Sequence, residues 1–456
     1  MAVYIVGGGF AGCEAAYQLS VRGIRVKLID MKPIKFSPAH HSRLLCELVC
    51  SNSFKSSDVN TASGLLKEEM RTLGSLILSC ADKSTVPAGG ALAVDRELFS
   101  RLVTEKLTES GNVEVVSEVV GGIGEIACRP DAEAVIIATG PLTDEALSLD
   151  IIRRLGEDSL SFFDAAAPLV FKNSINFEKA FYASRYGKGD SDYINCPMNE
   201  AEYAAFYKEL INAECAEVKD FDSGCVYEGC MPVEVMAGRG FDTLRYGPMK
   251  PVGITDPRTG ERFFAVVQLR RDDVSDTLYN IVGFQTRLKF GEQKRVFGMI
   301  PGLENAEFAR YGVMHKNTYI KSPGVLDQTF RVTGRSAGDD INVPLYFAGQ
   351  ITGVEGYIES ASSGLIAGIN AYCTLKKLPP FVTGAGTQTG ALAAYVSNYG
   401  GADFQPMGAN YGIMNPVLPE NAGKAIIRDK KRKKGLISNS ALDILKQTKA
   451  DRSDLF

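Results

Sequence analysis

The sequence predicts an α/β protein, built from a Rossmann-like domain with a parallel sheet and from a mixed α/β domain inserted into it. The first observation is the order of elements at the start, where an apolar run at 2–8 is followed by a helical pattern at 14–23 and a second apolar run at 24–31. Strand–helix–strand units of this kind form parallel sheets. Two later apolar runs, at 132–141 and 343–350, lead directly into glycine and extend the same pattern.

The second observation is a change in amino-acid composition and pattern between Pro168 and Asn317. Tyr, Phe and Asp become frequent there, and turns such as DPRTGER alternate with strand-like runs such as FFAVVQLRR and LYNIVGFQT. We interpret this stretch as an inserted domain, because the parallel-strand pattern resumes after it. The expected boundaries are 1–167 and 318–417 for the two parts of the first domain, 168–317 for the inserted domain and 418–456 for a basic C-terminal tail.

The composition is that of a globular protein with reduced thiols. The chain has 456 residues, of which 45% are apolar and 23% are charged. Its ten cysteines include no CxxC pair and its three histidines have no zinc-ligand spacing, so we predict no metal site. The apolar start has no basic segment before it, and no apolar run approaches the ~18 residues of a membrane span. These features favour a cytoplasmic protein that does not contact membranes.

The overall charge gives no indication of a nucleic-acid partner, because the formal net charge is −4. The run RDKKRKKG at 428–435 is a local exception. It is either a solvated, flexible face or a contact for RNA phosphates.

The stretch GGGFAG places Gly7, Gly9 and Gly12 in a GxGxxG pattern between the first strand and the first helix. Gly7 permits the tight turn, Gly9 lets a pyrophosphate approach the backbone, and Gly12 lets the helix pack closely. Asp30 closes the next strand, 18 residues after Gly12, and can accept a hydrogen bond from an unphosphorylated adenosine ribose. The motif alone also fits a plain tight turn, but this context predicts a dinucleotide site.

The later glycine segments favour FAD over NAD. ATGP at 138–141 and YFAGQITGVEG at 346–356 resemble the two late glycine turns of FAD-binding oxidoreductases. The second would aim a helix N-terminus at the pyrimidine edge of the flavin, where negative charge develops on reduction. The predicted cofactor-binding residues are Gly7, Gly8, Gly9, Phe10, Ala11, Gly12, Asp30, Gly140, Gly349 and Gly353.

Several strings spread over residues 3–412 belong together: SPAHHS, ELVCSNS, VPAGGALAVDRELF, YEGCMPVEVMA, GVMHKNT and YFAGQITGVEGYIESASSG. Through them the chain closely resembles the folate- and FAD-dependent tRNA (uracil-C5) methyltransferases of bacteria, and ELVCSNS and EGCMP are specific to that family. The flavoprotein that modifies wobble uridine with a partner GTPase shares the GGGFAGCEAA type of start. That family is longer and carries an extra C-terminal helical domain, so it is the second choice.

The resemblance implies that the protein methylates C5 of a uridine in the tRNA T-loop. It implies methylenetetrahydrofolate as carbon donor and FAD, reduced by NADPH or NADH, as carrier and reductant, without an obligatory protein partner. His315 in GVMHKNT matches the residue expected to cover the pterin, whereas His40 and His41 either contact anionic groups or cap a loop. Ribosomal RNA as the target, and a flavin-bound RNA-binding protein without catalysis, remain as alternatives.

Two cysteines match the catalytic pair of this family, Cys50 in ELVCSNS and Cys230 in EGCMP. C5 of uracil is a weak nucleophile, and a thiolate that adds to C6 turns C5 into an enolate carbon. A base must later remove the C5 proton so that the thiolate can leave. The resemblance makes Cys230 the nucleophile and Cys50 the general base or a partner on the flavin side. Without the resemblance, each thiol would be interpreted as a small buried hydrophobe.

Overall fold

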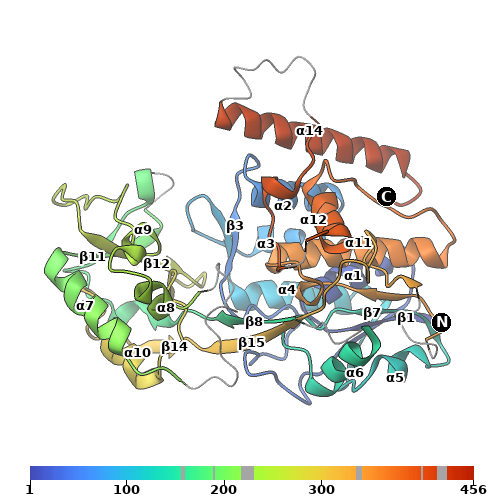
Figure 1. The fold of residues 1–456 in the computed structure, drawn as a ribbon, viewed down its shortest axis with the longest axis horizontal. Coiled ribbons are helices and arrows are strands. Elements are labelled where there is room, and N and C mark those ends of the chain that lie inside the picture. The colour runs from blue at the N-terminus through green and yellow to red at the C-terminus, as the bar shows by residue number, and fades with distance from the viewer. Residues whose placement is uncertain (156–159, 188–190, 217–230, 335–340, 402–403, 418–428) are drawn as a thin grey trace.

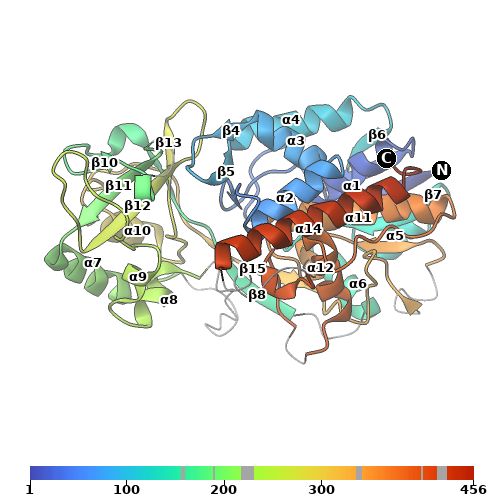
Figure 2. The same cartoon turned by 90° about the horizontal axis from the view of Figure 1, so that it is seen from above.

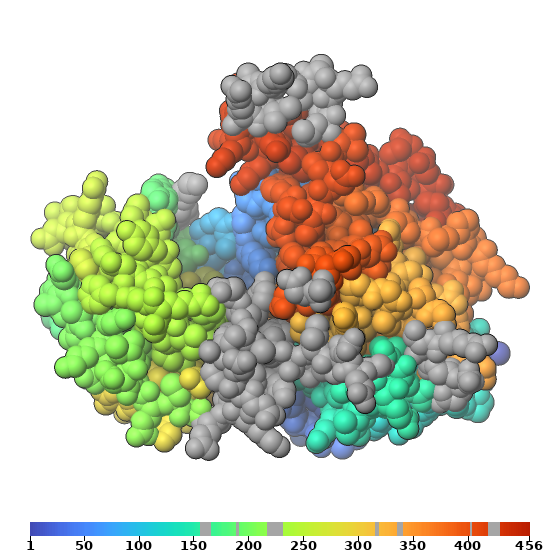
Figure 3. All heavy atoms as spheres, in the orientation of Figure 1, coloured from blue at the N-terminus to red at the C-terminus, as the bar shows by residue number. Residues whose placement is uncertain are grey.

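The chain folds into two lobes that lie side by side (Figures 1 and 3). The larger lobe contains both ends of the chain, and the smaller lobe, green to yellow in the figures, is formed by its middle. The structure is a computed structural model and describes residues 1–155, 160–187, 191–216, 231–334, 341–401, 404–417 and 429–456.

The larger lobe is built on a five-stranded sheet in which every pairing is parallel. Its strand order is β16-β7-β1-β2-β6. The central strand β1 is buried at every position, which explains why its sequence is continuously apolar instead of alternating. The predicted α/β class with a parallel sheet is thereby confirmed. The strands are β1 (Ala2–Val6), β2 (Val26–Asp30), β6 (Val113–Ser117), β7 (Ala132–Ile137) and β16 (Leu345–Phe347).

Helices cover both faces of this sheet (Figure 1). The two on one face are α5 (Ile123–Ala127) and α6 (Glu145–Leu155). No helix in the described ranges is long and apolar enough to cross a membrane. The helices on the other side are α1 (Phe10–Ser20), α2 (Ala62–Thr72), α3 (Leu76–Lys83), α4 (Arg96–Thr108), α11 (Tyr357–Leu375) and α12 (Gln388–Asn398).

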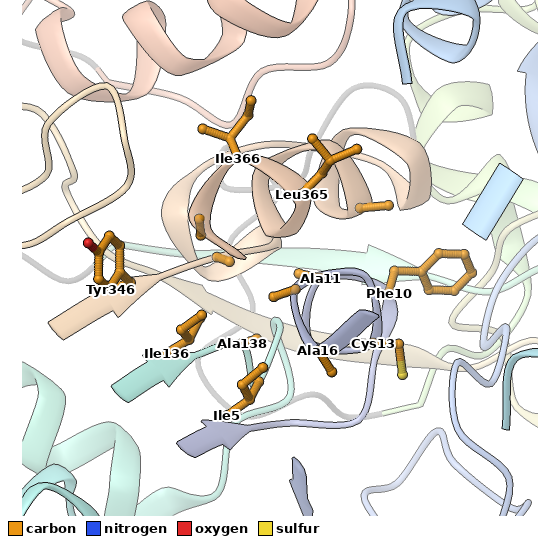
Figure 4. Close-up of a cluster of buried hydrophobic side chains, with 14 of the residues drawn as sticks. Ile5, Phe10, Ala11, Cys13, Ala16, Ile136, Ala138, Tyr346, Leu365 and Ile366 are labelled. Atoms are coloured by element: carbon orange, nitrogen blue, oxygen red, sulfur yellow. The ribbon is translucent and has the colours of Figure 1, made fainter. Parts of the chain in front are cut away.

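The helices α1 and α11 touch backbone to backbone. A side chain at Gly364 or Gly368 of α11 would overlap with the backbone of Ala11 or Ala15 in α1. Figure 4 shows the apolar side chains that pack around this contact and against strands β1, β7 and β16. The small residues of the segment SASSGLIAGINA therefore set the distance between α11 and the helix that follows the glycine turn.

Polar side chains start several helices in the way their sequences predict. Asp95 accepts a hydrogen bond from the Leu98 amide at the start of α4. Asn199 and Glu202 form a reciprocal capping box at the start of α7 (Glu200–Asn212). These contacts satisfy amides that have no partner within the helix, and each contributes about 1 kcal/mol.

The smaller lobe contains a six-stranded antiparallel sheet with the strand order β10-β11-β12-β13-β9-β14. One hydrophobic core of its own holds the sheet and its helices together. The strands are β9 (Leu169–Phe171), β10 (Phe181–Tyr182), β11 (Tyr193–Met198), β12 (Ala265–Arg271), β13 (Leu278–Ile281) and β14 (Phe308–Arg310), and the further helices are α8 (Val233–Gly238), α9 (Thr243–Tyr246) and α10 (Phe290–Phe297).

An antiparallel ribbon connects the lobes, formed by β8 (Leu160–Ala165) and β15 (Met314–Tyr319) (Figures 1 and 2). A small sheet of the larger lobe faces the inserted domain, and its strands are β3 (Ser53–Ser56), β4 (Thr85–Val86) and β5 (Ala91–Val94). Its turn contacts the other lobe directly, because the Tyr193 hydroxyl donates to the Ala88 carbonyl over 3.1 Å.

The C-terminal region, which the sequence predicts only as a basic tail, contains the long helix α14 (Lys430–Asp451). The helix lies across α2, α11 and α12 in the view from above (Figure 2). Ile437, Ala441 and Leu445 are buried against the larger lobe. The Ser438 hydroxyl also donates to the Val59 carbonyl over 2.8 Å. Residues 429–456 are thus a packed part of the larger lobe.

Candidate active site

A cleft opens at the carboxyl ends of the parallel strands, where ligands bind in folds of this type. Eight of the ten predicted cofactor residues line it, from four separate segments of the chain. These eight are Gly7, Gly8, Gly9, Phe10, Ala11, Asp30, Gly140 and Gly349.

The glycine turn has the geometry that a bound pyrophosphate requires. Gly7 has a φ of +109°, and a side chain there would overlap with the Ala138 carbonyl. Gly12 packs so closely on the Gly7 carbonyl that a side chain would overlap with it. Gly9, in contrast, is exposed at the start of α1, and a Cβ there would meet no protein atom within 4 Å. Gly7 and Gly12 thus shape the turn, whereas Gly9 leaves open space at a helix N-terminus.

Asp30 is held in place at the end of β2. One carboxylate oxygen accepts the Gly8 amide over 2.9 Å and the other accepts the Lys32 amide over 2.8 Å. Each oxygen keeps a lone pair for a further donor. The carboxylate therefore faces the cleft ready to accept hydrogen bonds from ribose hydroxyls.

The two late glycines of the segment 346–356 have different surroundings. Gly349 has a φ of +87° and lies 3.0 Å, measured from an ideal Cβ, from the Cβ of Ala11. Its amide donates to the Ser363 hydroxyl over 2.7 Å, which joins this glycine turn to α11. Gly353 has a φ of +88° and lies against the ring of Phe404, outside the cleft lining.

Cys50 is half-buried and directly follows Val49, which lines the same cleft. Its thiol and its amide are both 3.0 Å from the hydroxyl of Tyr357, the first residue of α11, which lines the cleft. Cys46, four residues earlier, is fully buried, and burial, then the neighbouring Cys13, raises the pKa of its thiol well above the ordinary value. The buried-hydrophobe interpretation describes Cys46 and not Cys50.

Two arginines from different lobes hold the Cys50 carbonyl. Arg96 of α4 donates to it over 2.9 Å, and Arg310 of β14 donates over 3.1 Å. Arg96 also forms a bidentate ion pair with Asp272, in which Nε is 2.6 Å from Oδ2 and Nη2 is 3.1 Å from Oδ1. Burial, then Arg96, lowers the pKa of Arg310 to about 10.

The polar residues after Cys50 connect the lobes. Arg270 donates to the Asn52 side chain over 3.1 Å and to the Ser51 hydroxyl over 2.8 Å. The side-chain Nδ2 of Asn52 donates to the Arg271 carbonyl over 3.1 Å. Three guanidinium groups therefore contact the CSNS segment, and one of them, that of Arg96, is paired with the Asp272 carboxylate.

The phenol beside Cys50 keeps its proton. Burial, then the neighbouring thiol of Cys50, raises the pKa of Tyr357 well above its ordinary value. Its ring stacks on Phe10 of the glycine-turn helix, with centroids 4.6 Å apart and an interplanar angle of 27°. Tyr357 therefore links the thiol of Cys50 to the wall of the cofactor cleft.

Cys230 lies outside the described residues, but the residues that follow it are placed. Met231 packs in a small apolar cluster with Met314, at the start of β15. The Val233 amide donates to the Gln285 carbonyl over 2.7 Å. Arg310, which holds the Cys50 carbonyl, is four residues before Met314, a span of at most about 14 Å. The segments next to both predicted cysteines thus contact one stretch of the inserted domain, residues 310–314.

The structure places the predicted histidines as follows. The backbone of His315 is in β15, where it pairs with Asp164 of β8. His40 lines the cleft, and its Nδ1 is 2.6 Å from the Ser37 hydroxyl. Burial, then Lys32, lowers the pKa of His40, so the ring is neutral. His41 is exposed at the surface.

Four residues of the site were missed from the sequence: Tyr357, Arg270, Asp272 and Arg310. Tyr357 follows the glycine segment directly, so its place at the start of the helix after a cofactor turn was a usable signal. The other three come from the inserted domain, and no local pattern marks them. No cluster of metal-ligating side chains occurs in the part of the chain that the structure describes.

We predict that Tyr357→Phe slows product formation by about 10–100-fold, as expected when one hydrogen-bonding group is lost from a catalytic set. The ring and its stacking on Phe10 remain, so bound flavin per protein should be unchanged. Turnover and flavin absorbance of the same preparation measure both effects. Full activity of Tyr357→Phe would mean that the hydroxyl beside the Cys50 thiol takes no part in the reaction.

We predict that Arg96→Gln lowers the free energy of unfolding by about 3–5 kcal/mol, because Asp272 would remain buried without its partner. Arg295, which is exposed and pairs with Glu292 and Glu209, offers a matched control, and Arg295→Gln should cost only about 0–1 kcal/mol. Urea unfolding of both variants gives the comparison. Equal losses would show that the Arg96–Asp272 pair is no stronger than a surface pair.

The parallel sheet, the glycine turn and Asp30 define the larger lobe as a dinucleotide-binding domain. Comparison with solved structures supports the fold: the GidA structure of Aquifex aeolicus, crystal form II, matches with a TM-score of 0.65 and 17% identity, over 98% of this chain and 76% of that one. The family model "Glucose inhibited division protein A" (GIDA) matches residues 2–379.

Curated relatives match over nearly their whole length. A protein of Acetivibrio thermocellus is 55% identical and one of Desulfitobacterium hafniense is 53% identical, each over 98% of both chains. Both are named methylenetetrahydrofolate–tRNA-(uracil-5-)-methyltransferase TrmFO. The chain belongs to the GIDA family and, within it, to the group of TrmFO proteins.

Proposed function

We propose that this protein methylates C5 of a uridine in the T-loop of tRNA, with methylenetetrahydrofolate as the carbon donor, FAD as the cofactor and NADPH or NADH as the reductant. The observation that carries the proposal is the position of Cys50. Its half-buried thiol forms a hydrogen bond with the hydroxyl of Tyr357, which lines the proposed dinucleotide cleft. The names of relatives of the same length support the choice of tRNA and folate. We place the activity in the cytoplasm.

The residues of the cleft fit FAD. The glycine turn offers open space at the N-terminus of α1 for a pyrophosphate, and Asp30 offers a carboxylate for a ribose. Gly140 and Gly349 would border the rest of the cofactor. Bound FAD supplies carrier and reductant chemistry for the one-carbon unit. We keep His315 as the residue proposed to cover the pterin.

The two cysteines would act on the uracil ring in sequence. The thiolate of Cys230 adds to C6, a C–S bond forms, and the electron pair of the C5–C6 bond moves to C5 and its neighbouring carbonyl. C5 then receives the methylene carbon of the donor, and reduced FAD would supply the two electrons that turn this carbon into a methyl group. Cys50 removes the C5 proton, and the electron pair of the broken C5–H bond restores the C5–C6 double bond and expels the thiolate of Cys230. We choose Cys50 for this role because its thiol is 3.0 Å from the hydroxyl of Tyr357 and because three arginines contact the segment that carries it.

A uridine within a folded loop must leave its stack to reach such a site. The junction of the two lobes, where the segments next to both cysteines meet residues 310–314, is the position we propose for the extruded base. Arg96, Arg270 and Arg310 would then act on the sulfur of Cys50 through the backbone and side chains that they hold.

Mass mapping of modified uridines tests the proposal. RNA from cells with and without the gene is digested, and methylated uridines are assigned to positions in tRNA and ribosomal RNA. The proposal predicts that ribothymidine of the tRNA T-loop disappears without the gene. Loss of a ribosomal methyluridine, or of a wobble modification, would assign the activity to one of the alternatives.

A further inference from the structure

The first turn of α14 carries five consecutive cations, from Lys430 to Lys434, and all five are exposed. The helix as a whole has seven basic and two acidic residues, whereas the complete chain has more acidic than basic residues. Within the described residues, the ion pair of this turn is the one between Arg432 and the N-cap residue Asp429, at 3.8 Å. The turn is thus a concentrated positive surface on an acidic protein.

This charge pattern opposes the stability of the helix. The N-terminus of a helix carries a partial positive charge, so cations in the first turn are unfavourable there. Like charges three and four residues apart add to the cost. The helix forms because Ile437, Ala441 and Leu445 are buried against the larger lobe. A run that weakens its own helix and contacts no core is better explained by a negatively charged partner than by folding.

The helix holds this turn at a defined place. Gly435 lies beside Asn60, and the Ser438 hydroxyl donates to the Val59 carbonyl. Residues 59 and 60 follow β3, which itself follows Cys50 in the chain. Figures 1 and 2 both show the N-terminal end of α14 pointing toward the junction of the two lobes. The positive turn therefore lies next to the segment that follows β3 and near the junction of the two lobes.

We propose that Lys430, Lys431, Arg432, Lys433 and Lys434 bind the phosphate backbone of the RNA whose uridine enters the site. This inference rests on the proposed function for the identity of the RNA. A folded RNA is a rigid polyanion, and a contact outside the reacting loop would fix its orientation without reading its sequence. The helix is a firm support for such a contact because its remaining turns are packed on the larger lobe.

Equilibrium binding of unmodified tRNA across a salt series tests the proposal. The variant K430Q/K431Q removes two charges. The fivefold variant, in which all five of these basic residues are replaced by glutamine, removes all five. The matched control is K208Q/K294Q, which removes two exposed lysines from α7 and α10 of the inserted domain. Each lost phosphate contact should lower the slope of log affinity against log salt by about 0.7–0.9.

We expect the double variant to bind tRNA about tenfold more weakly at low salt. The variant that lacks all five charges should bind more weakly still, and in both variants the affinity should depend less steeply on salt. KM for tRNA should rise, while kcat at saturating tRNA stays within about twofold, because these residues do not touch the reacting base. The control should keep the affinity and slope of the wild type.

Unchanged affinity and slope in the fivefold variant would overturn the proposal. So would equal losses in the control, or a drop in kcat alone. Binding to anionic lipid vesicles that the fivefold substitution abolishes, with tRNA affinity unchanged, would assign the surface to a membrane and also overturn it. Failure of the proposed function is separate: a wild type that binds tRNA but yields no methyluridine would refute the activity and leave the binding result to be judged by itself.

Discussion

Cys230→Ala and Cys50→Ala should each lose product by several orders of magnitude, and they should fail at different steps. Without Cys230 no C–S bond to the RNA can form. Without Cys50 the bond still forms, but the C5 proton stays and the thiolate cannot leave. Cys50→Ala should therefore accumulate a covalent complex with tRNA that contains ordinary uridine, whereas the wild type should not.

Denaturing gels of each variant mixed with tRNA, folate donor and reductant reveal the complex as a mobility shift. Cys128→Ala, which removes an exposed thiol elsewhere, is the matched control and should behave as the wild type does. RNA with 5-fluorouridine at the target should trap the wild-type complex, because fluorine cannot leave as a proton does. A complex with Cys230→Ala and none with Cys50→Ala would reverse the two roles. Full activity of Cys50→Ala would remove that residue from the mechanism.

Gly9→Val should abolish retention of FAD while leaving the fold intact. A Cβ at Gly9 meets no protein atom, so the larger side chain fits the protein and fills only the space in front of the helix. That space is where the pyrophosphate would approach. Flavin absorbance per protein after purification, and again after addition of FAD, measures retention.

Gly291→Val is the matched control, because Gly291, like Gly9, is an exposed glycine at the start of a helix with open space around it. The control should retain flavin, and both variants should show the circular dichroism of the wild-type protein. Flavin bound to Gly9→Val at the wild-type ratio would contradict the assignment of the cleft.

The fold of the larger lobe could be predicted because its signals are local. The strands on either side of α1 are short apolar runs, and Gly7, Gly9 and Gly12 each have a steric reason that the structure shows. Gly353 was assigned by resemblance, and its surroundings, the ring of Phe404, depend on a contact about fifty residues away. Local patterns cannot report such contacts.

The surroundings of Cys50 could not be predicted for the same reason. Arg270, Asp272 and Arg310 are more than two hundred residues from it in the chain, and the tertiary fold alone brings them together. The helix α14 is a different case. Ile437, Ala441 and Leu445 recur every fourth residue, a helical signal that the neighbouring charge run concealed.

Transfer of an isotope label tests the central claim most directly. Purified protein is given unmodified tRNA, a reductant and either methylenetetrahydrofolate labelled in its methylene carbon or S-adenosylmethionine labelled in its methyl group. The account predicts that label from the folate appears in the methyl group of uracil, only with reduced FAD present and not with Gly9→Val. Labelled methyluridine formed from S-adenosylmethionine alone would contradict it.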